Sequence, residues 1–277
     1  MQTARAVIFL LTLGALVASC GDEPAADAVS PIPDKTVVLT FDDGCRSQLT
    51  IVAPLLAEKG FGATFFATGA FMASEEFLDW EGLAAIHRMG FEIGNHTFGH
   101  HGYGGRKVGA LLEREVQRVE EALAEVGVPK PVSFAWPAGE FGPGARARLE
   151  RIGYCLARRG MEPEHPARTA QIGFAWDPSR QDRLLIPTTY VAHPNWTLEH
   201  FAEVVARARG GRPVVLQFHC VTDDPNKGFT VAPARFREFM DYLDREGYRC
   251  IAMRDLLPDV EGVTATGDRM LFTRHTH

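Results

Sequence analysis

The sequence has no extended cluster of lysine and arginine residues, and its charge balance is acidic. Its 277 residues include 29 Lys and Arg against 35 Asp and Glu, a formal net charge of −6. Proteins that bind nucleic acid present a basic patch or stripe, so this composition argues against nucleic acid as a partner. The apolar run at residues 6–19 is too short to span a bilayer comfortably, but it suits the core of a signal peptide.

The first 34 residues are predicted to lie outside the folded domain. Residues 1–20 have the pattern of a signal peptide and end in Val-Ala-Ser-Cys, which resembles a bacterial lipobox with Cys20 as the lipidated residue. An ordinary signal peptide with an incidental cysteine is the alternative. Residues 21–34 are rich in Pro, Ala and acidic residues and suit a flexible tether. We therefore expect a lipid-anchored protein of the bacterial cell envelope, on the periplasmic or extracellular face of a membrane.

Two adjacent carboxylates follow the first strong strand signal. Residues 37–41 are apolar or β-branched, and Asp42 and Asp43 come directly after them. Adjacent carboxylates repel each other, so a cation beside them would allow both to ionise. His96 and His100 follow a second apolar run, and on a helical turn their i, i+4 spacing would put both rings on one face. Two His and one carboxylate form a set used for catalytic metals, so we predict a site made of Asp43, His96 and His100.

Four motifs in this order resemble those of a known family. They are Thr-Phe-Asp-Asp-Gly (40–44), Gly-Ala-Thr-Phe-Phe (62–66), Asn-His-Thr-Phe-Gly-His (95–100) and Val-Val-Leu-Gln-Phe-His (214–219). The set is similar to the polysaccharide deacetylase (NodB-homology) domain, carbohydrate esterase family 4, over residues 35–257. Each motif alone is weak evidence, whereas the four together are specific.

Apolar, strand-like runs alternate with amphipathic stretches between residues 35 and 260. We expect strands at 37–41, 63–67, 91–94, 132–136, 184–191, 214–218 and 248–252, and helices at 48–58, 80–89, 108–126, 144–152, 198–209 and 233–245. Glycines expected to cap these helices are Gly60, Gly90, Gly127, Gly153, Gly210 and Gly247. The alternation predicts an α/β fold with a parallel sheet, and the resemblance implies a distorted (β/α)7 or (β/α)8 barrel. Residues 261–277 are expected to form a C-terminal tail.

The resemblance assigns a catalytic role to several of these residues. It implies that Asp42 is the general base, that His219 is the general acid, and that Asp43, His96 and His100 hold one divalent ion. Zn²⁺ is the ion we expect, with Co²⁺, Ni²⁺ and Mn²⁺ as alternatives, because such a site does not select strongly. Taken singly, Asp42 could instead cap the next helix, and His219 could be a buried residue at a strand end.

The third motif of the family is altered in this chain. Many members carry Arg-x-Pro-Tyr there, and the Arg orients the catalytic Asp, whereas this chain has Phe-Ala-Trp-Pro-Ala-Gly at 134–139. The backbone N–H of Ala138 could still bind an oxyanion. Trp136 is a candidate platform for a sugar ring, or else a core residue. Without the motif arginine, Arg180 and Arg183 are the candidates to orient Asp42.

The segment 158–183 is rich in Pro, His and Arg and is expected to be a loop. Asp177 within it is the candidate partner that would hold the acidic His219, with Asp182, Asp223 and Asp224 as competitors.

Lipidation of Cys20 would leave four cysteines for disulfide bonds: Cys45, Cys155, Cys220 and Cys250. An envelope location permits disulfides, and four cysteines allow three pairings. Cys45 follows the two aspartates and Cys220 follows His219, so we predict that these two pair across adjacent strands, with free thiols as the alternative.

The sequence thus predicts a metal-dependent deacetylase that hydrolyses N-acetyl groups of a GlcNAc-type glycan, such as peptidoglycan, a chitin-like chain or poly-N-acetylglucosamine. An O-acetyl xylan esterase and a cyclic-amide hydrolase are alternatives that would use the same site. A catalytically reduced glycan-binding lipoprotein is a third, because the motif arginine is missing. A structural envelope protein would leave the Asp and His residues unexplained.

Overall fold

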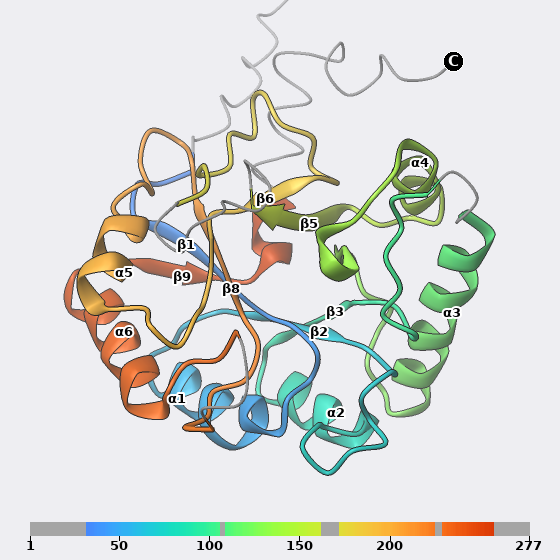
Figure 1. Ribbon diagram of the computed structural model, residues 1–277, viewed down its shortest axis with the longest axis horizontal. Coiled ribbons are helices and arrows are strands. Elements are labelled where there is room, and N and C mark those ends of the chain that lie inside the picture. The colour runs from blue at the N-terminus through green and yellow to red at the C-terminus, as the bar shows by residue number, and fades with distance from the viewer. Residues whose placement is uncertain (1–31, 106–108, 162–171, 225–228, 258–277) are drawn as a thin grey trace, which may run out of the picture.

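A computed structural model describes residues 32–105, 109–161, 172–224 and 229–257. The strands are β1 (Thr36–Phe41), β2 (Thr64–Ala67), β3 (Glu92–Asn95), β4 (Ser133–Ala135), β5 (Leu156–Met161), β6 (Ile186–Thr188), β7 (Tyr190–Val191), β8 (Val214–Phe218) and β9 (Arg249–Ile251). The α-helices are α1 (Ala53–Glu58), α2 (Trp80–Arg88), α3 (Gly109–Glu125), α4 (Pro143–Arg151), α5 (Leu198–Val205) and α6 (Pro233–Arg245). The helices lie around the outside of one sheet (Figure 1).

The sheet is parallel and closes through one extended segment. Its order is β6-β5-β4-β3-β2-β1-β8-β7, and β9 pairs with the amino half of β1. β6 pairs with β5 and β7 pairs with β8, yet only Thr189 separates β6 from β7. The N–H of Thr189 also donates to the carbonyl of Val215 in β8, at 2.8 Å. The described strands therefore form a nearly closed barrel, which confirms the predicted α/β barrel.

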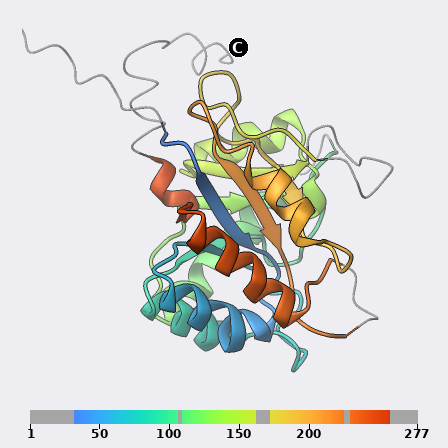
Figure 2. The same cartoon turned by 90° about the vertical axis from the view of Figure 1, so that its left-hand side faces the viewer.

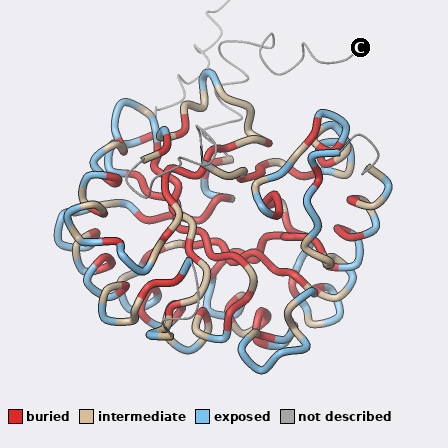
Figure 3. Tube along the Cα trace, in the orientation of Figure 1, coloured by how far each residue is buried: buried red, intermediate tan, exposed pale blue. Residues whose placement is uncertain are grey.

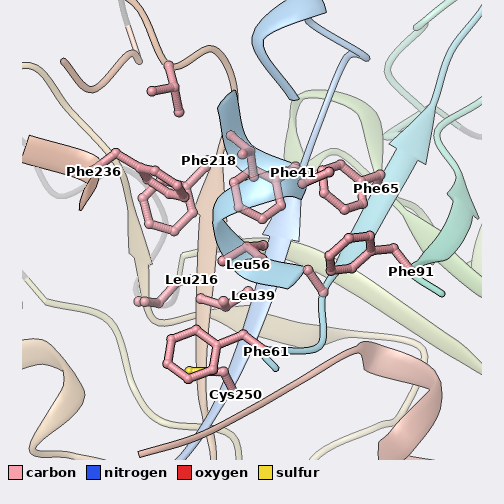
Figure 4. Packing of buried hydrophobic residues seen from close by; sticks show 14 of the residues in the cluster. Leu39, Phe41, Leu56, Phe61, Phe65, Phe91, Leu216, Phe218, Phe236 and Cys250 are labelled. Atoms are coloured by element: carbon pink, nitrogen blue, oxygen red, sulfur yellow. The ribbon is translucent and has the colours of Figure 1, made fainter. Parts of the chain in front are cut away.

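Side chains of the strands alternate between two cores. Val37, Leu39 and Phe41 point outward and pack against the helices in a large cluster. Figure 4 shows Phe41 within this cluster between Phe65 and Phe218, with ring centroids 4.9 and 5.3 Å away. Val38 belongs instead to a smaller apolar cluster inside the barrel. Because side chains alternate along a strand, Thr40 and then Asp42 continue this inward row toward the open end of the barrel.

The distribution of burial follows from this arrangement. Buried residues run along the strands and the helix faces turned toward them, and exposed residues lie on the outer faces of the helices (Figure 3). β1 and β8 lie side by side in the view of Figure 2 and pair along their whole length, from Val37 opposite Val214 to Phe41 opposite Phe218. Their carboxyl ends therefore reach the same level of the barrel.

Most of the predicted elements are present. The predicted strand 184–191 is divided into β6 and β7, the predicted helix 48–58 begins with a π-helical segment (Gln48–Val52), and two further elements differ. Five of the six predicted capping glycines follow an α-helix with positive φ, as expected for a left-handed C-cap. α5 ends earlier than predicted, at Val205, so Gly210 lies in the turn beyond it. The second difference is β5, because we predicted a loop from residue 158 and the chain forms a central strand between β4 and β6.

The predicted signal peptide, the lipidation site Cys20 and the predicted tail 261–277 lie outside the described residues. Within the described part of the chain, no helix combines the length and apolar character needed to cross a membrane.

Candidate active site at the carboxyl end of the barrel

The carboxyl ends of β1, β3 and β8 bring the predicted acidic and histidine residues together. The N–H of Asp42 donates to the carbonyl of Phe218 at 2.9 Å, which holds the end of β1 against β8. The N–H of His96 donates to the carbonyl of Ala67 at 2.8 Å, which holds the end of β3 against β2. Asp42 and His96 are both buried. This clustering at the strand ends is the position expected for the site of a barrel enzyme.

Asp43, His96 and His100 form one compact group of potential metal ligands. One ligand atom from each lies within 4.8 Å of the others. Oδ1 of Asp43 is 3.7 Å from Nε2 of His96 and 3.6 Å from Nε2 of His100. Nδ1 of His96 lies 2.8 Å from the carbonyl of Ala135, which fits a donated N–H and leaves Nε2 with a free lone pair. The structure therefore brings together the three ligands that the sequence predicts.

The backbone around these ligands is unusual. Asp43, Thr97 and His100 all have left-handed conformations, with φ of 71°, 64° and 52°. Non-glycine residues adopt this region at a cost, and such residues concentrate at functional sites. The prediction that His96 and His100 share a helical turn was wrong, because they lie in the irregular turn that follows β3. The turn brings the two rings together nevertheless, with centroids 4.8 Å apart.

The chemistry of this group fits a divalent cation. Oδ1 of Asp43 is buried and has no hydrogen-bond partner among the described residues. Burial, with the nearby charge of Asp42, raises the pKa of Asp43 to about 6, against an attraction to His219 that lowers it. Burial also lowers the pKa of His96 to about 3, so its ring is neutral and able to act as a ligand. A cation between these three side chains would satisfy the unpaired oxygen and both imidazoles.

Asp42 is held by an arginine that the sequence analysis did not identify. Arg158 of β5 is buried, and its Nη2 donates to Oδ1 of Asp42 at 2.6 Å and to Oδ2 at 2.5 Å. Burial alone would raise the pKa of Asp42, but the charge of Arg158, together with His96, His219 and the hydrogen bonds from Arg158, outweighs it and holds that pKa below its usual value. The candidates Arg180 and Arg183 do not take this role. Nη1 of Arg183 binds the carbonyl of Cys155, and Arg180 is exposed near the other end of the barrel.

Two further inward-facing side chains complete the surroundings of Asp42. Nε2 of Gln217 in β8 donates to Oδ2 of Asp42 at 2.8 Å. Nη1 of Arg158 donates to the hydroxyl of Thr188 in β6 at 3.0 Å, and that hydroxyl lies 3.4 Å from Oε1 of Gln217. We call Asp42, Arg158, Thr188 and Gln217 the base cluster. It joins side chains from β5, β6 and β8 to the residue that follows β1, across the inside of the barrel.

His219 lies beside the base cluster, as predicted, but its predicted partner lies elsewhere. Its Nε2 is 3.4 Å from Nε2 of Gln217, and its Nδ1 is buried with no partner among the described residues. Asp177 binds Ser179 and lies 3.1 Å from Nε of Arg212. The adjacent Trp176 bonds to Pro213, just before β8 begins, so Asp177 is at the opposite end of β8 from His219. The proposed pairing of Asp177 with His219 was therefore wrong.

The altered third motif forms a tight turn beside the metal ligands. Trp136 is 1% exposed and its Nε1 donates to the carbonyl of Leu184 at 2.9 Å, so it is a core residue and offers no face to a sugar. Ala138 follows in an exposed, left-handed position with φ of 54°. Ala138 follows β4, and the carbonyl of Ala135 in that strand contacts His96. The N–H of Ala138 therefore remains a candidate donor to an oxyanion.

The predicted disulfide is present. Cys45 and Cys220 are bonded, with their Cα atoms 5.4 Å apart, and the bond links the segments that follow β1 and β8. Among the described cysteines, Cys155 and Cys250 carry no disulfide. The bond lies two residues beyond Asp43 and directly after His219, at the edge of the candidate active site.

Comparisons with known proteins relate the chain to one family. Residues 30–157 match a family model described as polysaccharide deacetylase. The poly-beta-1,6-N-acetyl-D-glucosamine N-deacetylase of Escherichia coli strain K12 is 26% identical, in an alignment that covers 45% of this chain and 25% of that protein. The chain thus spans about a quarter of the length of the curated relative that it matches.

Two solved structures share the fold. A family 4 acetyl xylan esterase from Clostridium thermocellum, in complex with a cobalt ion, is 19% identical with a TM-score of 0.54, covering 82% of this chain and 96% of that one. A family 4 pseudoenzyme from Bacillus anthracis is 14% identical, also with a TM-score of 0.54, covering 81% of this chain and 68% of that one. At these identities the likeness shows the fold alone.

Proposed function

Because the chain carries a polysaccharide deacetylase domain of the NodB-homology type, we propose that it hydrolyses N-acetyl groups of a glycan built from N-acetylglucosamine units. The observation that supports this most strongly is the arrangement of two complementary groups at one end of the barrel. Asp43, His96 and His100 form a ligand set that fits a divalent ion. Next to it, Asp42 is paired with Arg158, and His219 follows the neighbouring strand.

Asp42 is the base in this proposal. Its lowered pKa keeps it ionised at neutral pH, so it can take a proton from the attacking water. A carboxylate has about four lone-pair sites. Arg158 uses one on each oxygen and Gln217 uses a second on Oδ2, which leaves a site on Oδ1 to receive the proton. The base cluster thus orients Asp42 and keeps one oxygen available.

His219 is the acid that gives a proton to the departing amine. An amine leaves as a neutral molecule only if its nitrogen is protonated, and imidazole is well matched to that transfer near neutral pH. Nε2 of His219 lies 3.4 Å from the amide nitrogen of Gln217, which can only donate a hydrogen bond, so this contact suits Nε2 as an acceptor once the ring has given up its proton. A divalent ion held by Asp43, His96 and His100 would supply Lewis acidity toward the acyl oxygen and the attacking water.

The presence of Arg158 bears on the alternative of a catalytically reduced binding protein. That alternative arose because the third motif has no arginine to orient Asp42. β5 supplies a buried arginine on the same carboxylate, so the base has its partner after all. A module that only binds a glycan has no need for a buried base and a histidine around a ligand set for a metal.

The proposal extends to location and metal. The signal-peptide pattern and Cys20 support lipid anchoring in the bacterial cell envelope, with the barrel held outside the cytoplasm. Zn²⁺ is the metal we propose, with Co²⁺, Ni²⁺ or Mn²⁺ able to replace it in a site of this composition.

Acetate release is the test, using the chain from residue 21, which contains every described residue. We would assay N-acetylglucosamine oligomers, peptidoglycan, acetylated xylan and small cyclic amides, after chelation and again with Zn²⁺ or Co²⁺ restored. We expect metal-dependent release from the oligomers, and a loss of about 100-fold or more in Asp42→Asn with metal content unchanged. Glu92→Gln is the matched control, because Glu92 is also a buried carboxyl, but at the start of β3.

The same assay separates amide from ester hydrolysis. His219→Ala should slow release from N-acetylated sugars far more than from acetylated xylan, because an alcohol leaves more readily than an amine without a proton donor. Equal effects on both substrates, or release from xylan alone, would favour the esterase reading. Metal binding without release from any substrate would contradict the proposed function.

A further inference from the structure

An exposed aromatic ring stands next to the proposed acid. Three large apolar side chains among the described residues are well exposed: Met89 (40%), Phe174 (56%) and Phe229 (57%). Of these, Phe229 has its ring centroid 5.7 Å from that of His219, with the planes inclined by 40°. An exposed phenylalanine at the edge of an active site has an apolar face available to a ligand.

The backbone holds Phe229 in this exposed position. Its φ is 52°, a left-handed conformation that is costly for a phenylalanine and that persists only where neighbouring structure imposes it. The next two residues anchor it, because Thr230 and Val231 are buried. Val231 accepts a hydrogen bond from Thr222 at 2.9 Å and donates one to Cys220 at 3.2 Å. The segment is therefore fixed to the chain that follows β8, and Phe229 is presented outward from it.

A second aromatic ring lies on the other side of the site. Phe71, in the loop after β2, has its centroid 5.4 Å from that of His100, and it stacks on Phe77 at 5.0 Å. The strand order is β3-β2-β1-β8, and Asp42 and Asp43 follow β1. Phe71 and Phe229 therefore flank the two aspartates, one on the side of the metal ligands and the other on the side of the acid.

We propose that Phe229 is a sugar-binding platform that stacks on the ring next to the unit being deacetylated, with Phe71 contacting the chain across the site. Sugar rings have apolar C–H faces and polar edges, so burying one face against a phenylalanine is favourable while the hydroxyls stay in water. Phe229 contacts His219, the residue that gives its proton to the departing amine, so in this proposal the ring upon it belongs to the unit next to the one that reacts. The substrate is then a chain of at least two sugars and not a free monosaccharide.

This inference rests on the proposed function and is tested by chain length. We would measure kcat and KM for acetate release from N-acetylglucosamine oligomers of one to five units. Phe229→Ala should raise KM for the longer oligomers about tenfold, with a loss that grows with chain length, and Phe229→Tyr should restore tight binding. Phe174→Ala is the matched control, because Phe174 is equally exposed but lines a different pocket, which Arg212 also lines, and lies two residues before Trp176, whose N–H bonds to Pro213 just ahead of β8.

Binding separates a failure of this inference from a failure of the proposed function. Calorimetry with the pentamer on the Asp42→Asn background reports affinity without turnover. Weaker binding in Phe229→Ala/Asp42→Asn than in Asp42→Asn supports the platform even if the wild type releases no acetate. Equal affinities, or a kinetic loss in Phe229→Ala that is the same for one unit as for five, would overturn it.

Discussion

Asp43, His96 and His100, which we call the metal-ligand group, lie beside the base cluster. The two groups differ in how fully their buried polar atoms are paired within the protein. In the base cluster, Asp42 already has three hydrogen bonds, between 2.5 and 2.8 Å, from Arg158 and Gln217. In the other group, Oδ1 of Asp43 is buried and has no hydrogen-bond partner in the described part of the chain, and its nearest imidazole nitrogens are 3.6 Å or more away. Arg158 balances the negative charge of Asp42, whereas a bound cation would be needed to balance that of Asp43. Substitutions in the two groups should therefore change stability in opposite directions.

The largest effect is expected from removing the balancing charge in the base cluster. Arg158→Met would leave Asp42 buried and unpaired, which we expect to lower the free energy of unfolding by about 3–5 kcal/mol and to abolish acetate release. Urea unfolding measures the first quantity. Arg183→Met is the control, since Arg183 is partly exposed, and it should cost less than about 1 kcal/mol. Wild-type stability in Arg158→Met would contradict the pairing, and adding Asp42→Leu should recover part of the loss.

The opposite sign is expected in the metal-ligand group. In the metal-free protein, burial raises the pKa of Asp43 from 3.8 to about 6, so the charged form of its carboxyl opposes folding at neutral pH. Asp43→Asn should then stabilise the metal-free protein at pH 8 by up to about 3 kcal/mol. The gain should shrink as pH falls through 6 and vanish below about pH 4, where the wild-type carboxyl is protonated in both states. Unfolding midpoints across this pH range would decide, and a loss of stability at pH 8 would contradict the prediction.

The affinity for the metal should also depend on the protonation of Asp43. A cation must displace the proton of Asp43 wherever that proton is bound, so affinity should fall about tenfold per pH unit below about pH 6 and level off above it. The pKa of His96 is about 3, so protonation of its ring should not compete with the ion in this range. Zn²⁺ titration at several pH values measures the slope. A constant affinity down to pH 4.5 would place the metal on other residues.

The smallest effect is expected from the neutral member of the base cluster. Gln217→Met removes one hydrogen bond from Asp42 and leaves Arg158 in place, which should cost about 1 kcal/mol in stability. We expect kcat to fall roughly fivefold with KM nearly unchanged, because Gln217 positions the base and does not bind the glycan. A change confined to KM would instead make Gln217 a substrate-binding residue.

The two groups also differ in how well the sequence predicts their members. The candidate ligands Asp43, His96 and His100 and the candidate base Asp42 directly follow apolar runs or stand in spaced motifs, so they were predicted and the structure brings them together. Arg158 was missed because it lies inside a strand, Leu-Ala-Arg-Arg-Gly-Met, whose charged residues erase the apolar pattern. A strand whose inward charge is neutralised by another strand looks like a loop when it is read alone.

A signal for Arg158 was nevertheless available. The altered third motif leaves Asp42 without the arginine that the family places there. Any other arginine that reaches Asp42 inside the barrel must then come from one of the strands. On β5, Leu156 belongs to the inner cluster and Ala157 to an outer one, so alternation turns the side chain of residue 158 inward. Asp177 and Trp136 failed for a different reason. Their motifs suggested a role, but position along β8 and burial in the core are properties of the folded chain.

The pairing of β1 with β8, two strands far apart in sequence, has a consequence for the order of events in folding. β1 is the first strand of the barrel to be synthesised, yet Arg158 comes 116 residues after Asp42, Gln217 comes 175 residues after it, and Cys220 comes 175 residues after Cys45. Contacts this distant in sequence form late and slowly. A nascent or truncated chain that ends before β8 therefore carries its two aspartates without a complete site, and the proposed hydrolytic activity should begin only once nearly all of the barrel has been made.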